Sequence, residues 1–401
     1  MLKAYRYRFY PEKELIDFLN KTFGCCRFVY NHFLKEKQTH YKEGQKSLTY
    51  SDCAKMLSDL KREHIWLKEV SSVPLQQSLR HLESAFGRFY KRLAKFPQYK
   101  KRRDRQSATF MKNSFQYEGG ELTLAKWGIP LDIRWSRKFK GKPSSLTISK
   151  SSTDKYYVSV LVEEEIVPLP FTSKTVGIDL GLTHAFVTSD GQKQTPSKSL
   201  QKSIKKLRRR QKSLSRKIKG SANRTKAKKT VALVCEKVRN QRLDAIHKMT
   251  TALVNENQVI CAETLSVKNM MKNKRLARSI SDAGWGMFLQ YVEYKSTWYG
   301  RNFVQMDRFF PSSKQCHHCE NLHEVLTLKD RAWTCLHCEI LHDRDINAAK
   351  NLEKEGLNKI SWSTMGHMGF KACGADVRPM WQPTGQSAMK QEPELRSSGI
   401  L

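Results

Sequence analysis

Four cysteines in two tight pairs are the residues of this chain best suited to binding a metal. Cys316 and Cys319 form one Cys-x2-Cys pair, and Cys335 and Cys338 form the second, with fifteen residues between them. Two such pairs can place four thiolates around one Zn²⁺, and a tetrahedron closed by four protein ligands is structural. The spacing predicts a zinc ribbon over residues 311–340, in which LTLKDRAWT is expected to form a small hairpin.

Three histidines lie inside these pairs, at His317, His318 and His337. Each could replace a thiolate as a zinc ligand. Because four cysteines already complete the ligand set, we expect these imidazoles to be exposed or to face DNA.

Two acidic residues stand at the ends of apolar strand-like runs. Asp179 ends TVGID and Glu263 ends VICAE, and a third candidate lies in HDRDINAAKNL. Carboxylates brought together from distant segments repel one another and have raised pKa values unless cations neutralise them. Mg²⁺ prefers such oxygen ligands, and two ions about 4 Å apart can promote phosphodiester cleavage. We therefore predict a catalytic site with two Mg²⁺ ions.

Asp343 and Asp345 compete for the third position. Asp343 stands where the N-cap of the following helical run INAAKNLEKEG would be. Asp345 would then lie in the first turn, and the small pair Ala348-Ala349 would let the helix pack closely on a sheet. We predict that Asp345 is the metal ligand and Asp343 the cap.

The charge of the chain indicates a polyanionic partner. Lysine and arginine number 73 against 38 acidic residues, a formal charge of +35. Nucleic acid is the first candidate and an anionic membrane surface the second. The sequence has no apolar run of transmembrane length and no signal peptide, so we expect a soluble protein of the cytoplasm, associated with the nucleoid, with its other six cysteines reduced.

Two basic clusters could hold that partner. Residues 88–105 contain nine basic residues and one acidic, with aromatic residues between them, and residues 201–230 contain fourteen basic residues and none acidic. Such clusters suit phosphate contact and base stacking. The candidate nucleic-acid-binding residues are Arg88, Lys91, Arg92, Lys100, Lys101, Arg102, Arg103, Lys205, Lys206, Arg208, Arg209, Arg210, Arg216 and Lys217.

Hydrophobic patterning divides the chain into regions. A strand at the N-terminus is followed by helical periodicity from residue 11 to about 110, and short β-rich runs from 115 to 167 could close a small barrel with that strand. From TVGID onward, strands and helices alternate, which predicts an α/β core. Residues 357–401 have no sustained period and are predicted to be a disordered tail.

The order of these motifs resembles the TnpB family, which insertion sequences of prokaryotes encode and which is related to type V CRISPR effectors. The resemblance is carried by GIDLGLTHAFVTSDG, AETLSVKNM, DAGWGMFLQYVEYK, FPSSKQCHHCE and CLHCEILHDRDINAAKNL, and it covers about residues 1–355. Asp179, Glu263 and Asp345 match the acidic triad of the family. One departure is Thr264, where the family usually has Asp or Asn after the glutamate.

The resemblance implies a multidomain α/β protein. It implies a β-barrel wedge domain (1–10 and 114–170), a helical recognition domain (11–113), an RNase H-like RuvC nuclease core (171–310 and 341–356) and the inserted zinc ribbon.

The activity implied is RNA-guided cleavage of double-stranded DNA. The guide RNA would derive from the end of the element, and a short motif beside the target would be recognised. Two alternatives are a catalytically inactive regulator or RNA-guided repressor, and a transposase that acts by direct strand transfer. The oligomeric state is left open.

Overall fold

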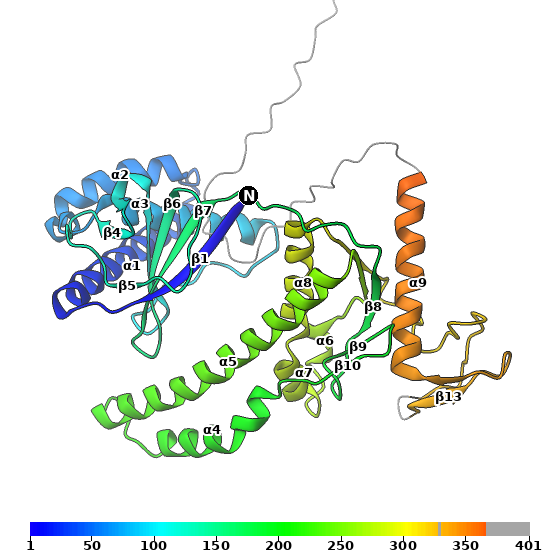
Figure 1. Ribbon diagram of the computed structural model, residues 1–401. Helices are drawn as coiled ribbons and strands as arrows, with labels where there is room; N and C mark the ends of the chain where they lie inside the picture. The colour runs from blue at the N-terminus through cyan, green and yellow to red at the C-terminus, as the bar shows by residue number, and fades with distance from the viewer. Residues whose placement is uncertain (328–329, 366–401) are drawn as a thin grey trace, which may run out of the picture. The chain divides into compact units, whose positions relative to one another are not determined.

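The computed structural model describes residues 1–327 and 330–365, which divide into two compact units (Figure 1). Met1–Glu164 belong to the first unit, and the described residues from Glu165 onward belong to the second. In these described ranges, no helix combines the length and the apolar character that crossing a membrane requires. Each unit has its own hydrophobic core.

The helices of the first unit follow the predicted periodicity. Leu15, Leu19 and Phe23 are buried on one face of α1, as three- and four-residue spacing requires. Thr49 and Asp52 form a capping box at the start of α2. The helical elements are α1 (Lys13–Lys42), α2 (Tyr50–Glu63), η1 (Ile65–Lys68), α3 (Ser72–Tyr90) and η2 (Lys112–Ser114).

The first unit also contains an antiparallel sheet with the order β2-β6-β7-β1-β5 and a separate β3-β4 hairpin. Its strands are β1 (Leu2–Phe9), β2 (Gln106–Met111), β3 (Phe115–Glu118), β4 (Glu121–Leu124), β5 (Ile133–Arg134), β6 (Pro143–Lys150) and β7 (Tyr156–Glu163).

Two sequence predictions for this unit need correction. The helical segment ends well before residue 113, because β2 pairs along its whole length with β6. Within residues 1–164, β2 and β5 are the edges of the sheet, so these pairings do not close the predicted barrel. Helices and sheet also share one core, in which Leu19 and Phe33 of α1 join Phe110 and Ile148 of the sheet.

The second unit is built on a mixed sheet with the order β10-β9-β8-β11-β12. β8 pairs antiparallel with β9 and parallel with β11, and β11 pairs parallel with β12. Asp190-Gly191 makes the predicted turn between β9 and β10, with Gly191 at φ +89°. The strands are β8 (Thr175–Asp179), β9 (Phe186–Thr188), β10 (Lys193–Gln194), β11 (Val259–Ala262) and β12 (Asn302–Gln305).

Helices cover both faces of this sheet. Val176, Ile178 and Ile260 point into a core shared with α5, α7 and α8. The helices are α4 (Ser199–Ser215), α5 (Ala222–Glu256), α6 (Val267–Met270), α7 (Ala277–Ala283), α8 (Trp285–Tyr299) and α9 (Arg344–Met365). Side chains alternate along a strand, so Gly177 and Cys261 face the other side, where α9 lies (Figure 1).

The packing of α9 against β8 is unusually close. A Cβ atom at Gly177 would lie 1.9 Å from the carbonyl oxygen of Ala349, and one at Gly356 would lie 2.2 Å from Cys261 Sγ. Ala348 and Ala349 are buried, as predicted. Only small residues permit this approach, so the position of α9 is fixed by backbone contact.

The region between β12 and α9 contains short strands β13 (Ala332–Thr334) and β14 (Leu341–Asp343), which pair antiparallel. The sequence predicts that LTLKDRAWT folds back on itself as a hairpin. That pairing is wrong, because Trp333 near the end of this segment pairs with His342, which lies beyond the second cysteine pair. The sequence boundary at residue 356 is also too early, since α9 continues to Met365. The remainder of the predicted tail, residues 366–401, lies outside the described residues.

Replacing Gly177 by alanine is expected to destabilise the second unit by roughly 3 kcal/mol, because the new methyl group meets backbone atoms that cannot rotate away. Gly286→Ala is the matched control, since nothing lies within 4 Å of that added Cβ in α8 and alanine favours helix. Urea denaturation of both variants measures the difference. Equal stability of the two would contradict the close packing.

Candidate active site and metal centre

The sheet brings two of the predicted carboxylates to the same edge. Cys261 pairs with Gly177 and Ala262 with Ile178, so Asp179 and Glu263 both follow at the carboxyl ends of neighbouring parallel strands. Alternation along each strand places both on the face that α9 covers. Both residues are half-buried.

The third carboxylate comes from α9. Asp345 lies in the first turn of the helix and is half-buried. Asp343 precedes the helix, and its Oδ1 accepts hydrogen bonds from the N–H groups of Asp345 and Ile346 at 3.0 and 3.1 Å. Its other oxygen, Oδ2, pairs with Lys193 Nζ at 2.7 Å. The predicted capping role of Asp343 is confirmed, and its charge is already paired.

The electrostatics of the site link the three acids. Burial raises the pKa of Asp179 well above its usual value, and the negative charges of Glu263 and Asp345 raise it further. Arg344 and Arg331 act in the opposite direction. Burial also raises the pKa of Glu263 to about 7, although the N–H of Leu180 donates to it and lowers the pKa.

Around Asp179, the positive charges of Arg344 and Arg331 offset only part of the effect of the neighbouring acids and of burial. Arg331 Nη1 lies 3.5 Å from Asp345 Oδ1, which is within ion-pair range but at the outer limit of a hydrogen bond. The three carboxylates are not gathered as closely as a metal-ligand set in this structure, in keeping with their mutual repulsion. Half-buried carboxylates, among them Asp179 and Glu263 with raised pKa values, form the kind of donor set that Mg²⁺ suits.

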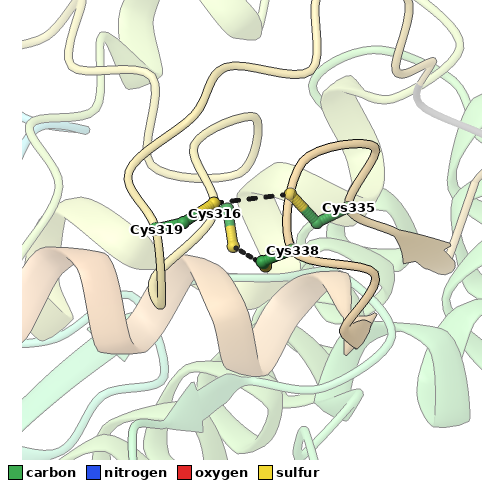
Figure 2. A group of neighbouring side chains, drawn as sticks. All are labelled: Cys316, Cys319, Cys335 and Cys338. Carbon is green, nitrogen blue, oxygen red and sulfur yellow. Dashed lines mark hydrogen bonds between the residues drawn. The ribbon is translucent and has the colours of Figure 1, made fainter.

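The four cysteines form a much tighter group. Their sulfur atoms all lie within 4.8 Å of one another, and among the described residues this is the one set of three or more such side chains gathered so closely. Cys316 Sγ lies 3.6 Å from Cys338 Sγ, and Cys319 Sγ lies 3.5 Å from Cys335 Sγ (Figure 2). A zinc tetrahedron with bonds of 2.3 Å places its sulfurs about 3.8 Å apart. The donor set therefore fits one zinc ion.

The two cysteine loops have the same backbone geometry. In the first, Glu320 N–H donates to the Cys316 carbonyl, and in the second, Glu339 N–H donates to the Cys335 carbonyl, each at 2.9 Å. Glu320 and Glu339 both have φ near +60°. Burial alone would raise the pKa of Cys335, but hydrogen bonds from the N–H groups of Cys338 and His337 help lower it to about 6. These N–H groups thus favour the thiolate form of Cys335.

The ribbon is attached to α9 by two buried asparagines. Asn347 Oδ1 accepts from the backbone N–H of His317 at 3.0 Å, and its Nδ2 donates to the Gln315 carbonyl at 2.7 Å. One turn later, Asn351 Nδ2 donates to the carbonyls of Ser312 and Gln315. The first cysteine loop is therefore fixed to the helix that carries Asp345.

The sequence reasoning missed three residues of this region. Arg331 reaches the acidic site from the ribbon, Asn351 anchors the ribbon, and His342 lies with Nε2 3.1 Å from Cys316 Sγ. The four-residue spacing of Asn347 and Asn351 on one helix face could have indicated the anchor. The other two depend on contacts that no local pattern encodes.

The first basic cluster lies mainly in the loop between α3 and β2. Arg88, Lys91, Arg92, Lys101, Arg102 and Arg103 are exposed. Lys100 is exposed as well, but its Nζ lies 3.8 Å from the centre of the Tyr30 ring and its backbone exchanges two hydrogen bonds with the Asn31 side chain. Lys100 fastens this loop to α1.

The second cluster lies on α4, which packs against the long helix α5 to form an arm of the second unit (Figure 1). Lys205, Lys206, Arg208 and Arg209 are exposed on α4 and Arg210 is half-buried, while Arg216 and Lys217 are exposed in the turn that follows. Buried Asp282 accepts from the N–H groups of Leu200 and Gln201 and so holds the base of the arm on α7. Whether these residues contact nucleic acid stays a prediction.

Comparison with family profiles identifies three segments. Residues 157–274 match a family described as "Probable transposase", and residues 285–352 match "Cas12f1-like, TNB domain". Residues 1–46 match a profile described as "Helix-turn-helix domain". In this structure, residues 1–46 contain β1 and one helix, α1.

Whole-chain comparisons agree. A Streptomyces pristinaespiralis protein named "Putative RNA-guided DNA endonuclease" is 42% identical over 405 residues, covering 99% of this chain and 98% of that protein. An Escherichia coli K12 protein, "Putative RNA-guided DNA endonuclease InsQ", is 31% identical, covering 92% of this chain and 96% of that protein. The Cas12f1 chain of a structure described as a "Cas12f1-sgRNA-target DNA complex" shares the fold with a TM-score of 0.56 at 15% identity, covering 85% of this chain and 83% of that chain. With such identity along nearly the full length of a relative, this chain belongs to the TnpB family.

Proposed function

We propose that this protein is the RNA-guided DNA endonuclease of a transposable element, and that it hydrolyses phosphodiester bonds of double-stranded DNA with two Mg²⁺ ions. The observation that carries the proposal is the placement of Asp179, Glu263 and Asp345. Although the three acids come from distant segments of the chain, the charges of Glu263 and Asp345 raise the pKa of Asp179. The names of the relatives described above support the same activity.

Each part of the second unit would have a distinct task in this reaction. Asp179, Glu263 and Asp345 would hold the ions, which when bound activate the attacking water and stabilise the leaving oxygen. Arg331, beside Asp345, would offset negative charge where the phosphate enters. The sheet order, three antiparallel strands extended by two parallel ones, supports an RNase H-like RuvC core.

The basic surfaces would hold the guide RNA and the DNA. Exposed cations on α4 and on the loop after α3 can contact phosphates in any sequence, while base pairing to the guide selects the target. The first unit would supply the recognition and wedge functions, including contact with a short motif beside the target. The guide RNA would come from the end of the element.

The chemistry of the acidic triad favours this nuclease over an inactive RNA-guided repressor. A protein that only binds nucleic acid has no need for a buried Asp179 whose pKa two further acids raise, because such an arrangement costs stability unless cations bind. No structural observation specifically favours strand transfer.

Expression of the full chain with the flanking DNA of its element tests the proposal. The purified protein should carry a discrete RNA and, with Mg²⁺, should cut DNA that matches the variable end of that RNA. Joining of DNA ends without bound RNA would support strand transfer instead. Tight RNA binding with no cutting of any matching target would support the repressor.

Replacing Asp345 by asparagine should lower the cleavage rate by at least about 10²-fold, because the variant loses one anionic ligand. Asp343→Asn is the matched control. Asparagine caps helices as well as aspartate does, so this variant should lose only the ion pair with Lys193 and keep most activity. The rates of both are measured with the copurified RNA, whose amount should not change. The reverse ranking would make Asp343 the ligand.

Divalent-cation binding should depend strongly on pH. Because the pKa of Glu263 is about 7, a proton must leave before this carboxylate binds a cation. Below that pH the apparent affinity should fall by roughly tenfold per pH unit for each proton displaced. Calorimetry with Mn²⁺ between pH 5.5 and about 8.5, in buffers of different ionisation enthalpy, counts those protons. Glu263→Gln should weaken binding and release fewer protons, and a pH-independent affinity would argue against the site.

Removing zinc should disturb the ribbon before the rest of the second unit. Cys335→Ala leaves three thiolates and should reduce the bound zinc from about one ion per chain to well below one. Elemental analysis of the purified protein measures the zinc. Cys235→Ala is the control, because Cys235 is exposed on α5, away from the four-cysteine set. Full zinc content in the Cys335 variant would contradict the four-thiolate assignment.

A further inference from the structure

His342 lies against the most buried of the four candidate zinc ligands. It is the middle residue of β14 and is 3% exposed, and Cys316 is 0% exposed. His342 Nε2 lies 3.1 Å from Cys316 Sγ. The His342 ring also packs against Trp333, with centroids 4.7 Å apart, so the imidazole is held in place from the side.

We propose that His342 donates a hydrogen bond from Nε2 to the Cys316 thiolate and thereby couples the zinc site to the first turn of α9. This inference rests on the proposed zinc site. A thiolate only accepts hydrogen bonds, so the hydrogen must be on Nε2 of His342. Outer-shell donors of this kind orient a metal ligand and tune its basicity.

The burial of Cys316 explains why this sulfur has a side-chain donor. Cys319 and Cys338 are half-buried, so water can reach their surroundings. Cys335 is buried but has the backbone N–H groups of Cys338 and His337 directed at it. A fully buried thiolate is stabilised by each donor directed at it, and the imidazole of His342 is a side-chain donor for Cys316.

Two routes connect this sulfur to the catalytic helix. In one, His342 is followed directly by Asp343, the cap of α9. In the other, the loop of Cys316 continues to His317, whose N–H groups face Asn347 Oδ1 at 3.0 and 3.1 Å. The rings of His317 and His342 meet edge to face at 4.9 Å. Both sets of contacts meet at His342 and lead to the first turn of α9, which carries Asp345. We therefore assign His342 as a positioning residue.

The competing interpretation is that His342 is itself a zinc ligand in place of one cysteine. Imidazole nitrogen binds zinc well, and the Nε2–Sγ distance alone does not distinguish a donor from a neighbouring ligand. The two roles differ in the ligand set. A donor leaves four thiolates on the metal, whereas a ligand leaves three thiolates and one nitrogen.

Two variants of the full chain, His342→Phe and His342→Gln, separate these roles. Phenylalanine keeps the ring against Trp333 and removes the donor, while the amide of glutamine restores an N–H near the position of Nε2. Cobalt substituted for zinc reports the ligand set through its d–d bands and the thiolate charge through its sulfur-to-metal charge-transfer band. Zinc affinity is measured by competition with a chelator, and order in α9 by amide hydrogen exchange.

The wild-type protein should show the d–d bands of four thiolates. In His342→Phe these bands should stay, the charge-transfer band should move to longer wavelength, and zinc affinity should fall by about 10- to 100-fold. Amides in the first turn of α9 should exchange faster. His342→Gln should restore the band position and most of the affinity, which a purely steric role of the ring would not predict.

Three results would overturn the inference. An unchanged charge-transfer band and zinc affinity in His342→Phe would show that no hydrogen bond to the thiolate matters. Bands of three thiolates and one nitrogen in the wild type, lost in that variant, would make His342 a ligand. A wild-type chain that binds neither zinc nor cobalt would reject the proposed zinc site itself, and the inference with it.

Discussion

The contact between α9 and β8 is the constraint on which the rest of the second unit depends. Gly177 lets the backbone of α9 approach so closely that a single methyl group would overlap the carbonyl oxygen of Ala349. Contact between backbones leaves little freedom of rotation or translation. The first turn of α9, and with it Asp345, is therefore held at the end of the sheet where Asp179 ends β8 and Glu263 follows β11.

The positions of Asp179, Glu263 and Asp345 are electrostatically unfavourable while no cation is bound. Packing of the core holds these acids in place, although burial raises the pKa values of Asp179 and Glu263 and the charges of Glu263 and Asp345 raise that of Asp179 further. The energy to do so comes from apolar packing on the opposite face, where Val176, Ile178 and Ile260 meet α5 and α8. One face of the sheet thus stabilises the unit, and the other concentrates the charge that a cation would relieve.

The ribbon acts as a second clamp on α9. Asn347 and Asn351 bind its first cysteine loop to the helix, and β13 and β14 lead the chain directly into the helix start. A small domain without much apolar core needs a metal to hold such a shape. The four-cysteine centre and the acidic centre are therefore mechanically connected, although their chemistry is separate.

The sequence alone determined the features that depend on residue type and local spacing. The Cys-x2-Cys pairs, the acids at the ends of apolar runs, the cap at Asp343 and the small pair at Ala348-Ala349 could all be predicted, because each is written in a few adjacent residues. The resemblance to the TnpB family came from the same short motifs.

Only the tertiary structure decided which residues contact one another when they are far apart in the sequence. The pairing of β2 with β6, the partner of β13, and the reach of Arg331 and His342 depend on register and burial, which many distant residues set together. The pKa values of the acids have the same origin. A carboxylate carries its charge by its type, but its proton affinity is set by the neighbours and the solvent that folding gives it.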